Sequence, residues 1–436
     1  MLQTEYNESL AITIELSLAS PTFRKLGPNA RDLLGVIAFF PQGIDENNLD
    51  WLFPTISNRK NLFDKFCVLS LTYRSNSFVT MLAPIRDYLG IQDPQSSALL
   101  CATRDHYFNR LSVRVDPKLP TFGETRWTVS EDANVEHLLD VFTSMGQNTE
   151  DSWNVCYHFI EHLHWHKPRQ TVLAPKIKAL PDDHDHKPKC LLELSQLFQQ
   201  IGNHTEQKSL LTQTLELHRR RGNTFQVAQT LRFLSDANRL LDLHEEGIQR
   251  AKEASKIFEQ INDTVGQGWC LNQLAWLSFD SNQLDAAKDA ASRALILVPK
   301  SGQEVLVCRL HRVLGNTYRS KREKEKSIHH FETALGIASR FDWNEELFWI
   351  HFALVSLFLN EREFDNANAR IEQAKSHAVG DTYKLGRAMR LQAQVWHRQG
   401  RLEDAKSEAL QALEIFQKFG AAKDAKICRD LLQKVE

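Results

Sequence analysis

Hydrophobic and small residues recur with a period of about 40 residues along the second half of the chain. One column of mostly small residues contains Ser195, Ser235, Ala275, Gly315, Val355 and Ala393, spaced 40, 40, 40, 40 and 38 residues apart. Two further columns contain Gln207, Gly247, Ala287, Ser327, Ala367 and Ala405, and Thr214, Ala254, Ala294, Ala334, Ala374 and Ala412. Periods of about 20 to 50 residues are typical of stacked supersecondary units. The pattern therefore predicts six repeats over residues 187–420.

Each repeat is expected to contain two antiparallel helices, because turn-forming residues divide every unit near its middle and at its end. The turns are predicted at Gly202-Asn203, Asp242, Asn282 and Gly400 within units, and at Gly222-Asn223, Asn262-Asp263, Ser301-Gly302 and Gly420 between them. Small residues allow two helix axes to approach closely, and a lone pair cannot bury its apolar face, so the units must stack. Residues 421–436 are predicted to form one more helix that caps the stack.

These columns resemble the tetratricopeptide repeat (TPR). Gly315 and Tyr318 match the small and aromatic positions of its first helix, Phe331 and Ala334 match those of its second, and Pro299 matches its terminal proline. The period exceeds the usual length of about 34 residues, as in longer-helix variants of the family. The resemblance covers residues 187–436 and implies a right-handed α-solenoid in which the first helix of each unit lines a concave face.

Arginine and aromatic residues recur at the positions that the resemblance assigns to that concave face. The candidate partner-binding residues are Arg232, Arg239, Trp269, Trp276, Arg309, Arg312, Arg319, Trp349, Phe352, Arg387 and Arg390. Arginine offers a rigid fork of donors for carboxylates, and tryptophan offers a large contact area. The pattern predicts an extended, acidic polypeptide partner with apolar anchors. The competing interpretation is that the arginines are solvated and the tryptophans cover a neighbouring helix.

The pattern of the N-terminal part is different. Residues 28–90 are predicted to form three helices, at residues 29–40, 46–53 and 59–66, then a hairpin from residues 68–73 and 78–82, and a helix at residues 83–89. Three helices followed by a hairpin are typical of a winged helix. Residues 1–27 are expected to form a helical spacer, and residues 91–186 an irregular helical linker that caps the repeats. The expected fold class is mainly α: a winged-helix-like domain followed by the solenoid.

Residues 26–44 (LGPNARDLLGVIAFFPQGI) and 78–89 (FVTMLAPIRDYL) resemble the winged-helix module of signal-transducing NTPases with numerous domains (STAND), particularly fungal NACHT or NB-ARC proteins that end in such repeats. Relatives carry a Met-His-Asp motif where this chain has Met81, Leu82 and Ala83, which argues against nucleotide sensing through that motif. No phosphate-binding G-x-x-x-x-G-K-[ST] sequence occurs. We expect the C-terminal portion of such an architecture without its NTPase core, which leaves an NTPase acting in trans as a candidate partner.

Composition narrows the classes of partner. The 436 residues carry a formal charge of −2, which gives no reason to expect bulk attraction to nucleic acid or membrane. The N-terminal segment lacks the features of a secretory signal, and no apolar run approaches the length of a membrane helix. Seven scattered cysteines without a C-x-x-C pair favour reduced thiols. The expected location is the cytoplasm.

No residue pattern indicates catalysis, a cofactor or a metal. His158 and His162 lie one helical turn apart, but their H-F-I-E-H order differs from the H-E-x-x-H of zinc hydrolases and no third ligand is identifiable. No nucleophile signature occurs. The chain is therefore predicted to be a non-enzymatic interaction scaffold.

Two alternative functions remain open at this stage. A TPR co-chaperone adaptor would hold a C-terminal carboxylate with side chains such as Asn272 and Asn316. A winged-helix DNA-binding regulator would use residues 58–65, which contain Arg59, Lys60 and Lys65.

Overall fold

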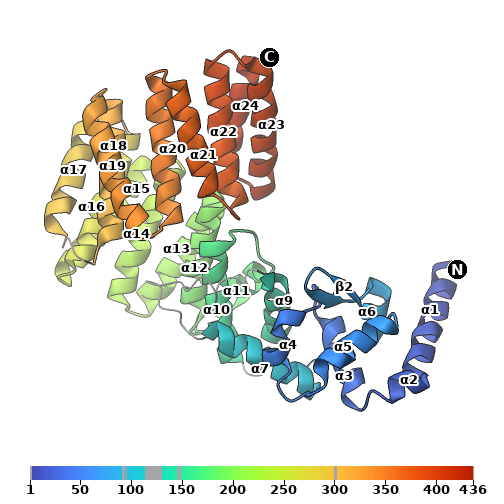
Figure 1. The fold of residues 1–436 in the computed structure, drawn as a ribbon. Helices are drawn as coiled ribbons and strands as arrows, with labels where there is room; N and C mark the ends of the chain where they lie inside the picture. The colour runs from blue at the N-terminus through green and yellow to red at the C-terminus, as the bar shows by residue number, and fades with distance from the viewer. Residues whose placement is uncertain are drawn as a thin grey trace. The chain divides into compact units, whose positions relative to one another are not determined.

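The computed structural model describes residues 2–90, 94, 96–112, 130–144, 149–298 and 302–435 (Figure 1). The chain divides into two compact units. The first contains Met1–His162 and Thr171–Leu173, and the second contains Leu163–Gln170 and Ala174–Glu436. The described part of the chain contains no helix of the length and apolarity that crossing a membrane requires.

The first unit has the winged-helix order of elements. After α1 (Leu2–Ala19) and α2 (Pro21–Arg24) come α3 (Asn29–Phe39), β1 (Ile44–Asp45), the short helices η1 (Glu46–Asn48) and α4 (Leu49–Leu52), α5 (Arg59–Val68), β2 (Tyr73–Ser75) and β3 (Phe78–Thr80). The strands form an antiparallel sheet in the order β1-β3-β2. Helix α6 (Ala83–Leu89) follows at the predicted residues. Helix α3 is buried along nearly its whole length and supplies the core of this unit.

The hairpin differs from its prediction in its first strand. Residues 69–72, expected to be extended, instead turn sharply, with Ser70 at a φ of 57° and the amide of Leu71 donating to the carbonyl of Phe66 at 3.0 Å. Leu71 is apolar, as a strand residue would be, but its side chain is buried in this turn. Strand β1 has only two residues, too few to produce an alternating pattern.

A buried carboxylate joins the winged helix to α7 (Ala98–Ser112) and α9 (Asp132–Ser144), which α10 (Thr149–His166) follows. Glu131 is fully buried and accepts hydrogen bonds from Asn48 at 2.7 Å, Tyr107 at 3.0 Å and Asn134 at 2.6 Å. Burial raises the pKa of Glu131. These contacts place residues 131–134 within the first unit.

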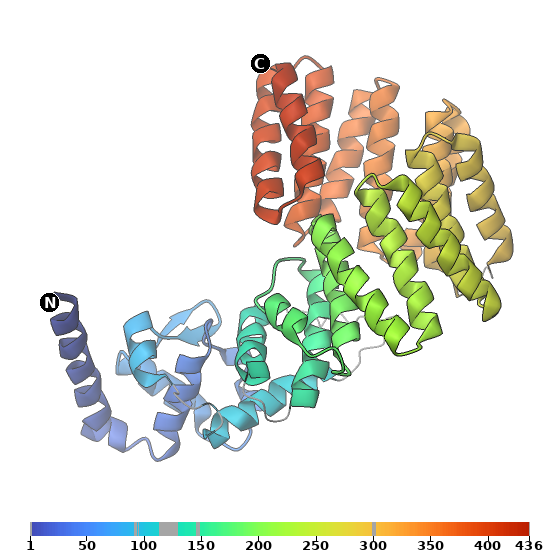
Figure 2. The same ribbon diagram turned by 180° about the vertical axis from the view of Figure 1, so that it is seen from behind.

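The second unit is a stack of helix pairs, as Figure 2 shows in green to red. The first helices of the six pairs are α12 (Lys187–Gln200), α14 (Thr224–Leu240), α16 (Thr264–Asp280), α18 (Glu304–Ser320), α20 (Asn344–Asn360) and α22 (Thr382–Arg398). The second helices are α13 (His204–Arg220), α15 (His244–Gln260), α17 (Leu284–Leu297), α19 (Lys324–Arg340), α21 (Phe364–Ser376) and α23 (Leu402–Phe419). Helix α11 (Ala174–Ala179) precedes the stack and α24 (Ala422–Val435) follows it.

Small residues allow the close packing of each pair. An added Cβ at Gly315 would lie 2.7 Å from the ring of Phe331, and the hydroxyl of Ser327 donates to the carbonyl of Gly315 at 2.8 Å. Members of all three small columns are buried throughout the stack. The TPR-like α-solenoid predicted from the sequence is therefore the architecture of this unit.

Every helix of the six pairs except α17 and α21 is followed within two residues by a residue of left-handed conformation. The positive φ values fall at corresponding positions of the repeats: 202, 242, 282, 322, 362 and 400 within units, and 222, 262, 302, 342, 380 and 420 between them. The next amide donates back to the helix, for example Leu243 to the carbonyl of Asn238 at 2.8 Å. Arg322 and Arg362 also adopt this conformation, so repeat position and not residue type dictates the turn.

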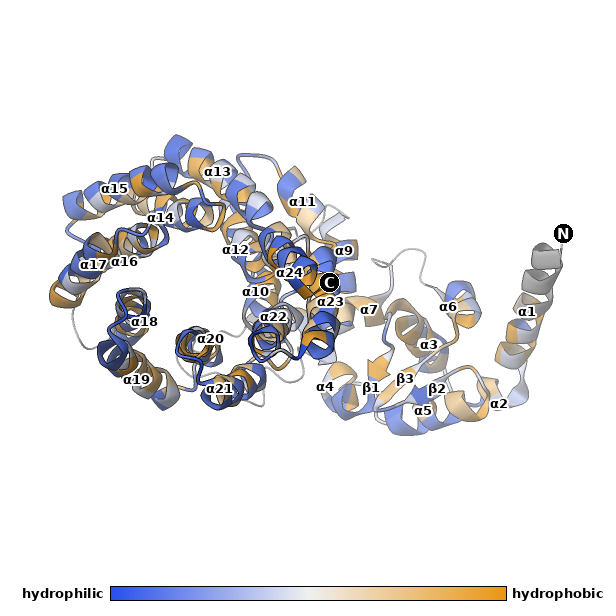
Figure 3. Ribbon diagram, turned by 90° about the horizontal axis from the view of Figure 1, so that it is seen from above, coloured by the Kyte–Doolittle hydropathy of each residue, from blue (hydrophilic) through white to orange (hydrophobic). Residues whose placement is uncertain are grey.

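The ends of the stack touch each other. The first helices form an inner ring surrounded by the second helices, and α22 and α24 lie beside α12 (Figure 3). The amide of Gln200 donates to Glu345 at 3.1 Å, and Lys423 pairs with Asp242 at 2.6 Å. A Cβ at Gly202 would lie 2.5 Å from the ring of Tyr383. The solenoid thus closes on itself, which the repeat pattern did not predict.

We expect Phe331→Ala to lower the free energy of unfolding by about 3–5 kcal/mol, because the fully buried ring fills the space beside Gly315. Urea unfolding followed by far-UV circular dichroism measures the change. The exposed neighbour Glu332 provides the control, and Glu332→Ala should change stability by no more than about 0.5 kcal/mol. Equal effects of the two substitutions would contradict the packing described.

We also expect stability to fall between pH 6.5 and 4. Burial lowers the pKa of His204, His330 and His351 to about 4, assisted by Arg387, His311 and Arg370 respectively. Below pH 6.5 the unfolded chain binds protons that the folded chain excludes, so acid favours unfolding. The lowered pKa of His204 should by itself reduce the free energy of unfolding by roughly 2 kcal/mol between pH 7.5 and 5. Urea unfolding at both pH values should show a smaller difference for His204→Gln than for the native chain.

Candidate functional site

The inner face of the stack brings the sequence-predicted residues onto neighbouring helices. Helix α14 carries Arg232 and Arg239, α16 carries Trp269 and Trp276, α18 carries three further arginines, α20 carries Trp349 and Phe352, and α22 carries the last two arginines. These helices form the inner ring in Figure 3. All the predicted residues are partly buried except Arg390, which is buried. Their side chains therefore contact one another and are not simply solvated.

Two tryptophans of α16 each lie between two arginines from the helices on either side. The guanidinium carbon of Arg232 is 5.1 Å from the Trp269 ring centroid, and that of Arg309 is 5.4 Å away. The corresponding distances from Trp276 are 5.5 Å to Arg239 and 5.1 Å to Arg312. Each such contact contributes about 0.5–2 kcal/mol, more where water is excluded. The result is two parallel arginine–tryptophan–arginine rows across three successive repeats.

The arrangement continues on the last two repeats. The guanidinium of Arg387 lies 5.0 Å from the ring of Trp349, and that of Arg390 lies 5.7 Å from the ring of Phe352. Aromatic contacts within α20 hold these rings, since Trp349 and Phe352 meet edge to face at 5.7 Å. Arginines and aromatic rings from neighbouring helices thus alternate from α14 to α22.

Two buried carboxylates each contact a pair of these arginines. Glu346 accepts from Arg309 at 2.6 Å and lies 3.6 Å from Arg312. Asp424 accepts from Arg387 at 2.8 Å and lies 3.6 Å from Arg390. Each carboxylate is 4% exposed. Within these contacts two cations share one anion, so each set of three side chains has a net positive charge. Glu345 also acts on Arg309 and helps to raise the pKa of that arginine.

The two guanidiniums that contact Asp424, those of Arg387 and Arg390, alter the acidity of this carboxylate. Its burial would raise the pKa of Asp424, but Arg387 and Arg390 outweigh this effect and lower it to about 2. The hydroxyl of Tyr383 also donates to Asp424, at 2.6 Å. Asp424 is therefore ionised at physiological pH and fixes both guanidiniums.

The arginines differ in how far their charge is neutralised. Arg239 pairs with Asp236 at 3.0 Å and with Asp280 at 2.9 Å. Arg319 donates to the amide oxygen of Asn316 at 3.1 Å, while its buried Nε has no hydrogen-bond partner. Among the described residues, no carboxylate lies within ion-pair distance of Arg232 or Arg319. Burial lowers the pKa of Arg232 to about 10 and also lowers that of Arg319.

Sequence reasoning missed Glu346, Tyr383 and Asp424. A signal for the carboxylates was present, because each lies 37 residues after an arginine of the inner face: Arg309 to Glu346 and Arg387 to Asp424. That offset joins the first helix of one unit to the start of the next. The sequence pattern identified the cations but not the anions that orient them.

The histidines of the linker do not converge on a metal site. His158 contacts Glu161 at 3.3 Å, and His164 contacts Glu193 at 2.6 Å. Within the described part of the chain, no group of three or more potential ligands could hold a metal ion. Within the predicted linker, residues 113–129 and 145–148 lie outside the described residues.

Comparisons with known proteins give similarities of fold at low sequence identity. No protein-family model matches the chain, and no curated protein matches it. A Rap protein complexed with Competence and Sporulation Factor has a TM-score of 0.49 and 12% identity, covering 76% of this chain and 97% of that one. A Rap conjugation gene regulator of plasmid pLS20, in complex with the Phr* peptide, has a TM-score of 0.46 and 10% identity over 90% of this chain and 98% of that one.

A third solved structure is a STAND protein with a tetratricopeptide repeat sensor from Pyrococcus horikoshii. It has a TM-score of 0.44 and 14% identity, and the match covers 94% of this chain but only 63% of that one. All three TM-scores are below 0.5.

Proposed function

We propose that the inner face binds an extended acidic polypeptide, and that the chain is a non-catalytic interaction scaffold. The observation that supports this most directly is the surplus of guanidinium groups on neighbouring inner helices. Arg309 and Arg312 share one carboxylate, Arg387 and Arg390 share another, and Arg232 and Arg319 have none within ion-pair distance. Six cations less two anions leave four positive charges in these contacts. Carboxylates of a partner would neutralise this positive charge.

Aromatic rings beside the arginines supply the apolar part of the proposed site. Trp269, Trp276 and Trp349 are each partly exposed, so one portion of each ring packs against an arginine while another remains accessible. Rigid aromatic rings give contact area at a small entropic cost. A partner that alternates acidic and apolar side chains would match this surface.

The rows across successive repeats favour an extended partner over a compact one. The inner helices from α14 to α22 each contribute arginines or tryptophans, so similar groups recur from one of these helices to the next. Stacked repeats characteristically use such a concave surface to hold an elongated ligand. A segment of polypeptide that crosses several inner helices could contact one row after another.

The two alternative functions have less support. A co-chaperone clamp needs available amides, but Asn272 is 2% exposed and the amide of Asn316 donates to the carbonyl of Arg312 at 3.0 Å. For DNA binding, Arg59, Lys60 and Lys65 would have to be available; both lysines are exposed, but Arg59 pairs with Asp50 at 2.6 Å. Ion pairs within the winged helix reduce the charge available for phosphate.

The order of elements supports a wider proposal, that the chain is the sensing arm of a STAND-like signalling protein in the cytoplasm. A winged helix followed by helical repeats is the arrangement that the sequence resemblance implies. An NTPase acting in trans is then a candidate partner of the first unit, while the inner face of the second unit takes the polypeptide.

The proposed binding can be tested with a fluorescein-labelled random copolymer of glutamate and tyrosine. Fluorescence anisotropy of the full-length chain should show binding that the double variant Arg232→Gln, Arg319→Gln weakens about tenfold, equivalent to about 1.4 kcal/mol. The loss is expected because both unpaired guanidiniums are removed while the two carboxylate-bound groups stay intact.

A second double variant, Arg250→Gln and Arg293→Gln, provides the matched control. It changes the net charge equally, but both arginines lie on second helices, α15 and α17. It should bind the copolymer almost as the native chain does, and a lysine–tyrosine copolymer should not bind. Equal weakening by the two double variants would show that net charge, and not the inner face, governs binding.

A further inference from the structure

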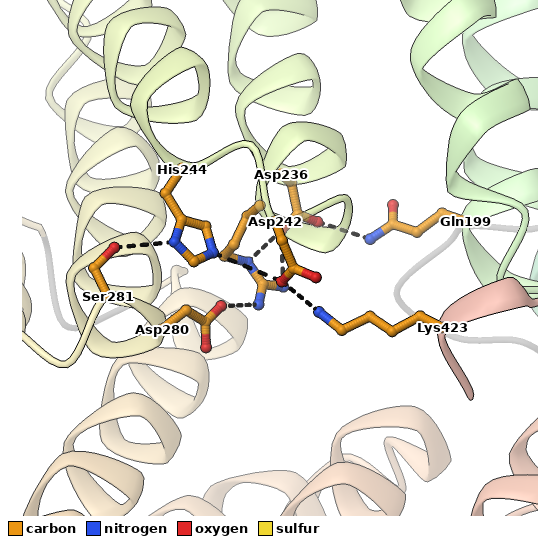
Figure 4. A network of polar contacts seen from close by, with 8 residues as sticks. Gln199, Asp236, Asp242, His244, Asp280, Ser281 and Lys423 are labelled. Atoms are coloured by element: carbon orange, nitrogen blue, oxygen red, sulfur yellow. Dashed lines mark hydrogen bonds and ion pairs between the residues drawn. The ribbon is translucent and has the colours of Figure 1, made fainter. Parts of the chain in front are cut away.

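Contacts between the ends of the stack form a small set on the rim of the ring. Figure 4 shows Lys423 of α24 reaching across to Asp242, in the turn between α14 and α15. Gln200 at the end of α12 meets Glu345 at the start of α20. Tyr383 of α22 packs against Gly202, in the turn after α12. We call these three contacts the clasp.

Asp242 also contacts a histidine of its own repeat, and a second set of polar contacts lies beside this one. His244 lies 3.8 Å from Asp242 through its Nε2, and its Nδ1 contacts the hydroxyl of Ser281 at 3.1 Å. Beside it, Asp236 accepts from Gln199 at 2.8 Å (Figure 4). Asp236 also accepts from Arg239 at 3.1 Å. Lys423 thus supplies a cation from the last helix to an acidic region of the second repeat.

We propose that the clasp gates the inner face, so that it must part before a polypeptide can enter. This inference rests on the proposed function. In a solenoid each repeat packs mainly on its neighbours, so small rotations at successive interfaces add up at the ends. The contacts of the clasp oppose that motion across the ring. Lys423 and Asp242 are 51% and 63% exposed, and an ion pair so exposed is weak and screened by salt.

Tyr383 connects the clasp to the proposed binding groups. Its ring contacts Gly202, and its hydroxyl donates to Asp424 at 2.6 Å and accepts from Arg387 at 3.1 Å. A partner carboxylate that binds Arg387 or Arg390 competes with Asp424 for these cations. A guanidinium drawn towards a partner carboxylate no longer donates to the Tyr383 hydroxyl, which loosens the ring that packs against Gly202, so binding inside and opening at the rim favour each other.

Two pairs of variants distinguish loss of the clasp from a general loss of stability or charge. Gly202→Ala places a Cβ against Tyr383, whereas Gly400→Ala has the same position in its repeat and a similar φ, 80° against 76°, with nothing within 4 Å. Lys423→Gln removes the exposed ion pair, whereas Lys426→Gln makes the same charge change on the exposed side of α24. Each control carries the backbone strain or the charge change without touching the clasp.

Spin labels at Glu245→Cys and Arg429→Cys, with Cys67 and Cys101 replaced by serine, report the separation of the ends in the full-length chain. Double electron–electron resonance should give a short distance in the parent and both controls. A longer population should appear in Gly202→Ala and Lys423→Gln, and in the parent when salt rises from about 0.05 M to about 0.5 M. At constant salt, the two clasp variants should bind the glutamate–tyrosine copolymer about tenfold faster.

Unchanged distances in both clasp variants would show that the clasp does not hold the ends of the stack together. Longer distances with an unchanged association rate would overturn its role as a gate. Absence of copolymer binding in every variant would overturn the proposed function and the gating with it, while the distances would still show whether the clasp holds the ends together.

Discussion

The structure of the second unit depends on the close approach of helices at small residues. Gly315, Ser327 and Ala334 let α18 and α19 pack with Phe331 between them, and equivalent positions repeat through the stack. Because most of the helices have 17 residues and each ends in a short turn, residues about 40 apart occupy corresponding places. Regular spacing of the positions that line the inner face follows from this. The rows of arginine and tryptophan on the inner face are a consequence of the same packing constraint.

The binding groups show a compromise between stability and availability. An isolated guanidinium is costly to bury, whereas a fully neutralised one offers little attraction to a ligand. Glu346 and Asp424 each hold two arginines, which orients the side chains without cancelling their charge. Stacking on Trp269, Trp276 and Trp349 further restricts their rotamers. Less conformational entropy is then lost when a partner carboxylate binds.

The sequence predicted features that repeat locally and missed those that depend on accumulated geometry. The small columns located the six helix pairs, and the positions beside them located the arginines and tryptophans of the inner ring. The winged-helix order was also predictable, although the turn at Ser70 looked like a strand because Leu71 is apolar. Arg322 and Arg362 could not be read as left-handed turn residues, since only their repeat position requires that conformation. Whether the inner arginines bind a partner stays a prediction.

Closure of the ring could not be read from the period, because a period records how one repeat follows the next but not the rotation between them. That rotation, summed over six repeats, decides whether Asp242 meets Lys423. Such closure through a few rim contacts has a thermodynamic consequence. If strong contacts held the ring closed, the free energy needed to break them would be subtracted from the binding free energy of every ligand. Weak contacts instead keep the open state accessible. The clasp contains one exposed ion pair, one amide–carboxylate contact and one aromatic contact, which suits a surface that has to open and close.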